Sequence, residues 1–314
     1  MSEYAITTDR LAKYYSRLRA VDGLNLRVPR GSMYGFLGRN GAGKTTTIRM
    51  LMGLARPTLG SATLFGLRWP ENGLAILERV GYLPEKKQLF DSMTGCDLVR
   101  FNRPYFPRWS DEAAKKYAQL LEIPMDRAFK KLSLGNRTKL CLLLAMAQGA
   151  DMLVLDEPTS GLDPVVMDEL LRVLVEDYAG EGRTIFLSSH NLAEVEKVAD
   201  WVGIIDEGKL LLEAPLEEIR ADFRRVIASG NSLPAGPAPQ VISARACDNV
   251  CDYFLRNGAD NFVAGLRNQG ASVLEVSHLN LEQVFLRLVK KEEPCISGNT
   301  GATPAVASSS TWAS

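Results

Sequence analysis

Residues 38–46 constrain the fold of this chain more than any other segment, because they read Gly-Arg-Asn-Gly-Ala-Gly-Lys-Thr-Thr, a complete G-x-x-x-x-G-K-[ST] pattern. An apolar run at 33–37 precedes the pattern, and residues 44–52 have the composition of a helix. The sequence therefore predicts a buried strand, a tight glycine loop and a helix N-terminus in that order, the context in which such a loop binds phosphate.

The glycines of this loop indicate a nucleotide ligand. Backbone N–H groups can converge on a polyphosphate only where bulky side chains are absent from the closest approach. We expect Lys44 to reach the β- and γ-phosphates as a point charge, and the Thr45 hydroxyl to bind Mg²⁺. The nucleotide-binding residues predicted in the loop are Gly38, Asn40, Gly41, Ala42, Gly43, Lys44, Thr45 and Thr46.

Composition narrows the classes of partner. Lys plus Arg and Asp plus Glu balance at 37 each, so no net field favours nucleic acid or an anionic membrane surface. The longest apolar run, at 140–147, is far shorter than the ~20 residues of a membrane span. The N-terminal residues have no leader pattern, and the scattered cysteines include no C-x-x-C. We expect a cytoplasmic protein with reduced thiols.

Two further apolar runs end in polar residues suited to phosphate chemistry. The run at 152–155 ends in Asp156 and Glu157, as a buried parallel strand does where its tip enters a ligand crevice. Asp156 can hold Mg²⁺, and Glu157 can orient or deprotonate an attacking water. A role of Asp156 or Glu157 as a cap of the next helix is less favoured, because Asp163, which precedes a proline, is a better helix cap. The run at 185–189 ends in His190, which we expect beside Glu157 and the γ-phosphate.

Two helix starts complete the set of candidate features. His190 is followed by Asn191 and Glu194, which have the spacing of a capping box. Ser133 and Gly135 open a long amphipathic helix, where an anion could be received, although many helices begin in this way only for capping. The other histidine, His278, lacks such a setting and is interpreted as structural.

In this order and spacing, the motifs resemble the nucleotide-binding subunit of an ATP-binding-cassette (ABC) transporter over residues 4–218. The resemblance implies that Tyr15 stacks on adenine, with Tyr14 as its rival. It implies that Glu85, where many members have Gln, contacts Mg²⁺, a substitution that resembles the exporter branch of antibiotic, lantibiotic and acetoin-utilisation systems. The resemblance also implies nucleotide and dimer contacts from Ser133, Gly135 and Asn136 of the family signature, and from Asp163 of a dimer-contact loop. In this signature Leu134 replaces Gly and Asn136 replaces Gln.

The resemblance also implies an architecture and a mechanism. The fold class is α/β, a P-loop NTPase domain of the ABC type with a mixed sheet and a helical subdomain, plus a small α+β C-terminal extension. Two subunits, identical or related, sit head to tail, and ATP with Mg²⁺ on Lys44 of one chain is covered by Ser133 and Gly135 of the other. Glu157, His190 and Lys44 are the implied catalytic residues of an ATPase that drives export.

The implied partner is a separate transmembrane permease, so the subunit is expected at the inner face of the cell membrane. The alternative is a soluble cassette ATPase that acts on ribosomes or nucleic acid, but the charged linker or coiled-coil insertion of such proteins is missing. A regulator that does not hydrolyse ATP would require a lost carboxylate, and both Asp156 and Glu157 are present. No nucleic-acid partner is expected.

The sequence predicts three regions: a nucleotide-binding domain at 1–218, an accessory domain at 219–292 and a disordered tail at 293–314. An aromatic and proline-rich stretch at 101–109 is predicted to lie in the helical subdomain, with a groove for a permease helix as the functional alternative. In the accessory domain, strands are predicted at 223–228 and 271–276, and helices at 248–256, 259–267 and 279–288.

Overall fold

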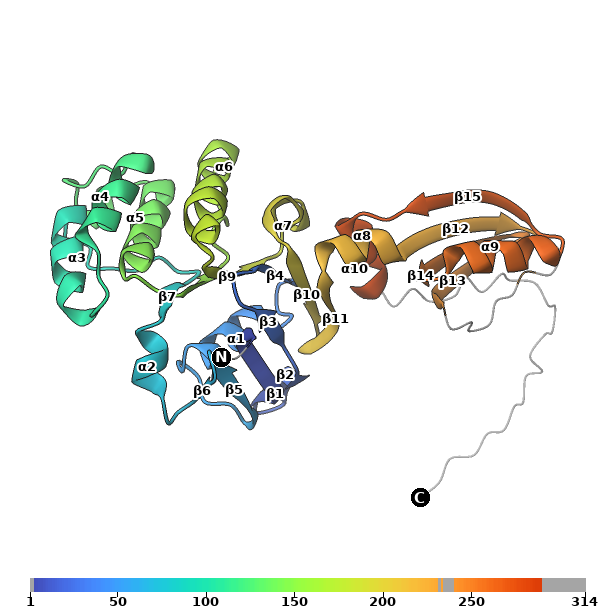
Figure 1. The fold of residues 1–314 in the computed structure, drawn as a ribbon, viewed down its shortest axis with the longest axis horizontal. Helices are drawn as coiled ribbons and strands as arrows, with labels where there is room; N and C mark the ends of the chain where they lie inside the picture. Colours follow the sequence, from blue (N-terminus) through green and yellow to red (C-terminus); the bar gives the residue numbers. More distant parts are fainter. Residues whose placement is uncertain (1–2, 231–232, 234–239, 290–314) are drawn as a thin grey trace, which may run out of the picture. The chain divides into compact units, whose positions relative to one another are not determined.

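The structure is a computed structural model that describes residues 3–230, 233 and 240–289 (Figure 1). Contacts divide the chain into two compact units. The first unit is Met1–Ala221 together with Asn280–Val289, and the second centres on Asp222–Leu279. The predicted tail at 293–314 lies outside the described residues. No helix in the described part of the chain is both long and apolar enough to span a bilayer.

A six-stranded sheet in the order β11-β10-β4-β9-β8-β7 forms the centre of the first unit. Its strands are β4 (Met33–Leu37), β7 (Val80–Leu83), β8 (Met152–Asp156), β9 (Thr184–Ser189), β10 (Trp201–Asp206) and β11 (Lys209–Pro215). All neighbours are parallel except β10 and β11. The strands β4, β8 and β9 are buried along their whole length, which explains their continuous apolar sequences and confirms these three predicted strands.

Strand register brings three predicted functional segments to one edge of this sheet. Leu37, the last residue of β4, is opposite Ser189 of β9, and Asp156 of β8 is opposite Ser188. Because these strands are parallel, the loops that follow them leave from the same edge. The glycine loop, Glu157 and His190 therefore converge although they are about 30 to 150 residues apart in the sequence.

A second, antiparallel sheet in the order β2-β1-β5-β6, with β3 paired to β1, packs with the central sheet around a shared core. Its strands are β1 (Tyr4–Tyr15), β2 (Leu18–Leu24), β3 (Arg27–Pro29), β5 (Leu59–Leu64) and β6 (Leu67–Arg68). Helix α1 (Lys44–Leu51) contributes Ile48 to this core, and the stacked rings of Tyr34 and Phe186 lie in it with centroids 5.4 Å apart. The short helix α2 (Gly73–Leu77) follows this sheet. The helix that starts at the phosphate loop is thus held from both sheets.

Between β7 and β8 the chain forms the predicted helical region (Figure 1). Its helices are α3 (Gly95–Asn102), α4 (Asp111–Leu120) and α5 (Leu134–Ala147), with 3-10 turns at Arg103–Tyr105 and Phe129–Lys131. The Ser133 hydroxyl caps α5 by accepting a hydrogen bond from the Asn136 N–H at 3.2 Å. Helix α5 lies directly against β7, since a Cβ on Gly81 would be 2.6 Å from the Ala145 carbonyl oxygen.

The other helices of the first unit follow strands β8, β9 and β11 or close the described chain. They are α6 (Pro164–Val173), with a π-helical turn at Leu174–Tyr178 and a 3-10 turn at Ala179–Glu181, α7 (Leu192–Val198), α8 (Leu216–Asp222) and α10 (Leu281–Val289). Asp163 caps α6 as predicted. The capping box predicted at α7 is wrong: the Asn191 amide instead donates to the Glu194 carboxylate at 2.5 Å, and that carboxylate also accepts from the Thr159 hydroxyl at 2.6 Å.

The second unit is a four-stranded antiparallel sheet in the order β13-β14-β12-β15. Its elements are β12 (Phe223–Ser229), β13 (Val241–Cys247), β14 (Val250–Arg256), α9 (Ala259–Asn268) and β15 (Ser272–His278). The predicted strands at 223–228 and 271–276 and the helix at 259–267 are confirmed. The helix predicted at 248–256 is wrong, because Cys251, Tyr253 and Leu255 alternate into the core while β14 pairs with strands on both sides.

The last predicted helix, at 279–288, is present as α10, and its contacts assign it to the first unit. Its Leu281 N–H donates to the Glu196 carboxylate at 3.3 Å, and the helix packs on α7. The accessory domain predicted at 219–292 therefore stays a prediction in its boundaries, and the last helix of that range contributes to the first unit.

Replacement of Gly81 by alanine is expected to destabilise the first unit. The added Cβ would meet the backbone of α5, which cannot rotate away as a side chain can. We expect the free energy of unfolding to fall by about 1–3 kcal/mol. The control is Gly180→Ala, whose Cβ would lie at an ordinary 3.7 Å from the nearest atom. Chemical denaturation would measure both, and equal stabilities would contradict close packing of α5 on β7.

Candidate nucleotide site

The loop at 38–43 leaves β4 and enters α1 with glycines at the positions where the chain tolerates no side chain. A Cβ on Gly38 would lie 2.5 Å from the Ile205 carbonyl oxygen, and one on Gly43 would lie 2.4 Å from the Ala20 carbonyl oxygen. Gly43 also has φ of 109°. The backbone is therefore fixed against β10 and β2, and its turn leads directly into the N-terminus of α1, as anion binding requires.

Lys44 is buried at the base of this loop, with its side chain 6% exposed. Its Nζ donates to the carbonyl oxygens of Gly38 at 2.7 Å and Arg39 at 3.3 Å, and forms an ion pair with Glu157 at 3.1 Å. A buried ammonium without such partners would be strongly unfavourable. The cation is thus held ready beneath the loop, with a carboxylate as its present counter-charge.

Asp156 is the last residue of β8 and is fully buried. Its Oδ1 accepts from the Ser188 hydroxyl at 2.7 Å and from the Thr45 hydroxyl at 3.3 Å. Its Oδ2 is buried and has no hydrogen-bond partner among the residues that the structure describes. Burial raises the pKa of Asp156, and the bonds from Ser188 and Thr45 only partly oppose this. A buried carboxylate oxygen without a partner is suited to a cation ligand.

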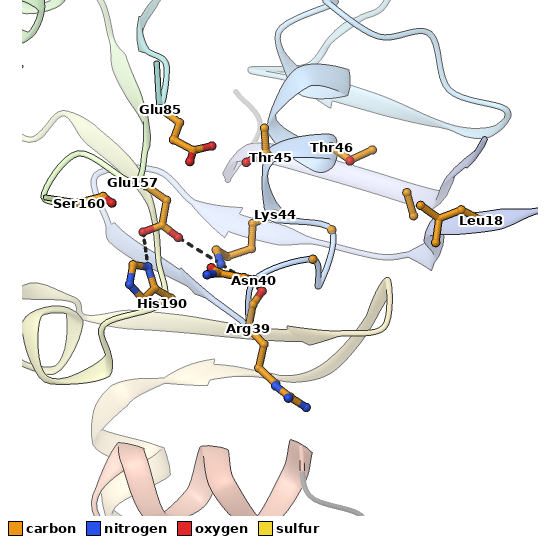
Figure 2. A pocket seen from close by; sticks show the side chains of 13 residues that line it. Leu18, Arg39, Asn40, Lys44, Thr45, Thr46, Glu85, Glu157, Ser160 and His190 are labelled. Carbon is orange, nitrogen blue, oxygen red and sulfur yellow. Dashed lines mark hydrogen bonds and ion pairs between the residues drawn. The ribbon is translucent and has the colours of Figure 1, made fainter. Parts of the chain in front are cut away.

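Glu157 bridges the phosphate loop and the histidine (Figure 2). Its Oε1 is 3.1 Å from Lys44 Nζ, and its Oε2 is 2.8 Å from His190 Nδ1. The backbone has φ of 47°, in the left-handed region, and its N–H is shared between the Ser188 carbonyl and hydroxyl oxygens at 3.2 and 3.1 Å. A strained backbone of this kind persists only where its surroundings determine it, and it is common at functional sites.

These groups open onto a cavity of about 380 Å³. Its wall combines the phosphate loop, the acid at the end of β8 and residues from two neighbouring loops. The lining residues are Leu18, Ala20, Arg39, Asn40, Gly41, Gly43, Lys44, Thr45, Thr46, Glu85, Glu157, Ser160 and His190. The Glu85 carboxylate projects toward the same space as Thr45 (Figure 2). The structure thus brings together most of the predicted phosphate, metal and catalytic residues.

Other predicted site residues lie elsewhere in the first unit. Tyr15 does not line the cavity; the residue is 44% exposed, and its ring centroid lies 5.0 Å from the Lys13 ammonium. The rival Tyr14 is also absent from the lining and donates from its hydroxyl to Asp22 at 2.7 Å. Ser133, Gly135 and Asn136 at the start of α5, and Asp163 before α6, are outside the lining, while Gly38 and Ala42 support the loop without facing the cavity.

Sequence reasoning missed three groups at this site. Leu18 and Ala20, on the strand after the tyrosine pair, line the cavity where an aromatic ring was expected. Ser188 bonds both Asp156 and the backbone of Glu157. Its place two residues before His190 on a strand next to β8 was an available signal, because adjacent parallel strands align such positions.

A phosphate loop on one strand, a buried acid pair on a second and a histidine on a third define a nucleotide-binding domain of the P-loop class. The ABC transporter family matches residues 21–160. The bacitracin transport ATP-binding protein BcrA of Bacillus licheniformis is 38% identical over 229 residues, which cover 72% of this chain and 74% of that protein. The Nod factor export ATP-binding protein I of Ralstonia nicotianae is 33% identical over 306 residues, which cover 91% and 94%.

Solved structures agree with these relatives. One, described as the ATP-binding subunit of an ABC transporter, is 26% identical and superposes with a TM-score of 0.63 over 69% of this chain and 92% of that one. The chain therefore belongs to the ABC transporter family as an ATP-binding ATPase subunit that powers transport. The predicted family, fold class and transport-linked ATPase activity are confirmed, and these relatives give no support to the ribosome or nucleic-acid alternative.

Replacement of Lys44 by alanine is expected to weaken ATP binding by about 10-fold or more, because the variant removes the buried cation beneath the phosphate loop. A tenfold loss of affinity corresponds to only about 1.4 kcal/mol. Nucleotide titration by calorimetry or fluorescence would measure the change. Lys197→Ala, at an exposed position of α7, serves as the control and should bind as the parent does. Unchanged affinity in Lys44→Ala would contradict the assignment of the loop.

Proposed function

We propose that this subunit hydrolyses ATP with Glu157 as the general base, as half of a head-to-tail pair that drives export through a separate membrane-spanning permease. The observation that carries the proposal is the Glu157 carboxylate, held between Lys44 and His190 at the mouth of the cavity. A carboxylate in hydrogen-bond reach of the phosphate side can orient and deprotonate the attacking water. His190 would then contact the γ-phosphate and hold Glu157 in its rotamer.

The residues present fit Mg²⁺ beside the nucleotide. Thr45 and Glu85 line the cavity and carry oxygen donors. Asp156 lies behind Thr45, whose hydroxyl donates to its Oδ1, and its Oδ2 is a buried oxygen without a partner among the described residues. In the described part of the chain, no group of three or more His, Cys, Asp or Glu residues could hold a metal by itself. Mg²⁺ does not require such a group, because it takes one or two protein oxygens and completes its coordination shell with phosphates and water. The ion would neutralise charge on the phosphate oxygens.

A second chain would supply what this site lacks. Ser133, Gly135, Asn136 and Asp163 lie outside the cavity lining of their own chain. Ser133 is exposed at the N-terminus of α5, where free N–H groups and the helix dipole favour an anion. A head-to-tail pair would let this terminus cover ATP bound to the other chain, and the partner could be a second copy or a related cassette. ATP would then favour the closed pair through its better binding to that state.

The names of two relatives support a separate membrane partner and export as the direction of transport. Their names describe bacitracin transport and Nod factor export. The chain itself has 37 Lys plus Arg and 37 Asp plus Glu residues, so no net positive charge favours nucleic acid. The subunit would therefore sit at the cytoplasmic face of the cell membrane, on a permease that carries the substrate. Tyr15 stays a candidate for adenine stacking, since Leu18, three residues later, lines the cavity.

Glu157→Gln is expected to reduce ATP turnover below about 1% of the parent rate while ATP binding is retained, because the amide keeps the shape of the side chain but cannot accept a proton. The variant should accumulate an ATP-bound dimer, which size-exclusion chromatography with ATP would detect. Glu71→Gln, at an exposed position, should behave as the parent does. Turnover at the parent rate in Glu157→Gln would exclude this residue as the general base.

Mixing two inactive variants tests the head-to-tail arrangement. Lys44→Ala breaks the phosphate loop, and Ser133→Arg blocks the start of α5 at a cost of about 1 kcal/mol for the lost cap. If each site combines both chains, a mixed pair retains one intact site, and ATP hydrolysis should return on mixing. Lys44→Ala mixed with Glu157→Gln is the matched control and should stay inactive. No recovery with the first mixture would contradict sites shared between chains.

A further inference from the structure

Lys87 belongs to none of the motifs that identify the site, yet it contacts Glu157 directly. It lies in the loop between β7 and α3, two residues after Glu85. Its Nζ donates a hydrogen bond to the backbone carbonyl oxygen of Glu157 at 3.1 Å. The adjacent Lys86 is exposed and makes no hydrogen bond or ion pair to any described residue, so the two neighbouring lysines have different environments.

The backbone of Glu157 depends on the bonds around it. With φ of 47°, this residue has a left-handed conformation that a side chain with a Cβ disfavours. Its N–H is held by Ser188, and its carbonyl oxygen accepts from Lys87 and from the Ser160 N–H at 3.3 Å. Because φ sets the direction of the Cα–Cβ bond, the groups that hold this peptide also determine where the carboxylate points.

Lys87 is partly buried among groups that come from three elements. Burial lowers the pKa of Lys87, while Cys141 of α5 and the carboxylates of Asp156, Glu85 and Glu157 act in the opposite direction. These electrostatic neighbours come from its own loop, from the end of β8 and from α5. A charged donor to a carbonyl oxygen forms a stronger hydrogen bond than a neutral one. Lys87 is therefore more than a solvated surface lysine.

We propose that Lys87 is a positioning residue for ATP hydrolysis, which holds the left-handed backbone of Glu157 so that its carboxylate is directed at Lys44 and His190. The proposal rests on the proposed role of Glu157 as the general base. Lys87 lies in the same loop as Glu85, which lines the cavity. A displacement of this loop would shift the Glu85 carboxylate and release the backbone of Glu157 together.

Three variants of the full-length chain test this proposal. Lys87→Met removes the ammonium and keeps the length of the side chain, Lys87→Arg keeps a charged donor, and Lys86→Met is the matched control. We expect Lys87→Met to lower kcat for ATP hydrolysis by about 10-fold to 100-fold, the scale of a small misplacement of a catalytic group. KM for ATP and the affinity measured by nucleotide titration should change by less than about twofold. Lys87→Arg should recover most of kcat, and Lys86→Met should equal the parent.

Several outcomes would overturn the proposal. A parent-level kcat in Lys87→Met would mean that Glu157 needs no support from this side chain. A parallel loss of kcat, ATP affinity and thermal midpoint would indicate general loosening of the site, and equal losses in the Met and Arg variants would show that the donor is not what matters. Glu157→Gln is assayed alongside to separate the role of Lys87 from the proposed role of Glu157. Parent-level turnover in Glu157→Gln would contradict Glu157 as the general base, whatever the Lys87 variants show.

Discussion

The buried ion pair between Lys44 and Glu157 is the interaction on which the rest of the site depends. Both side chains are removed from water, and neither charge would be tolerated there alone. His190 shares the other carboxylate oxygen, so one side chain connects the ends of β4, β8 and β9. A polyphosphate that enters the cavity brings negative charge to Lys44 and competes with Glu157 for it. The pair is therefore both a structural tie and a contact that a ligand can exchange.

Much of this arrangement could be predicted from sequence because it follows from short-range patterns and one topological rule. Continuous apolar runs identified β4, β8 and β9, since strands buried on both faces have no polar alternation. Parallel strands release their loops at one edge, which brought Lys44, Asp156, Glu157 and His190 together without further information. The glycine pattern placed the turn. These features are local in sequence, and tertiary packing did not overrule them.

The errors arose where tertiary partners decide the outcome. Residues 248–256 have a composition that allows a helix, but pairing with β12 and β13 selects a strand. Glu194 has the spacing of a capping residue, yet the hydroxyl of Thr159, 35 positions earlier, draws it away from the helix N-terminus. The support of Glu157 by Lys87 spans 70 positions and has no local signal. The stacking of Tyr15 on adenine stays a prediction, because Tyr15 lies outside the cavity lining and its ring is beside the Lys13 ammonium.

Because α10 belongs to the first unit, the second unit is flanked in the sequence by segments of the first. Residues 222–279 stand between two stretches of one compact unit, so they form an insertion and not an appendage. A shortened chain that ends after β11 would leave the face of α7 that α10 covers open to solvent.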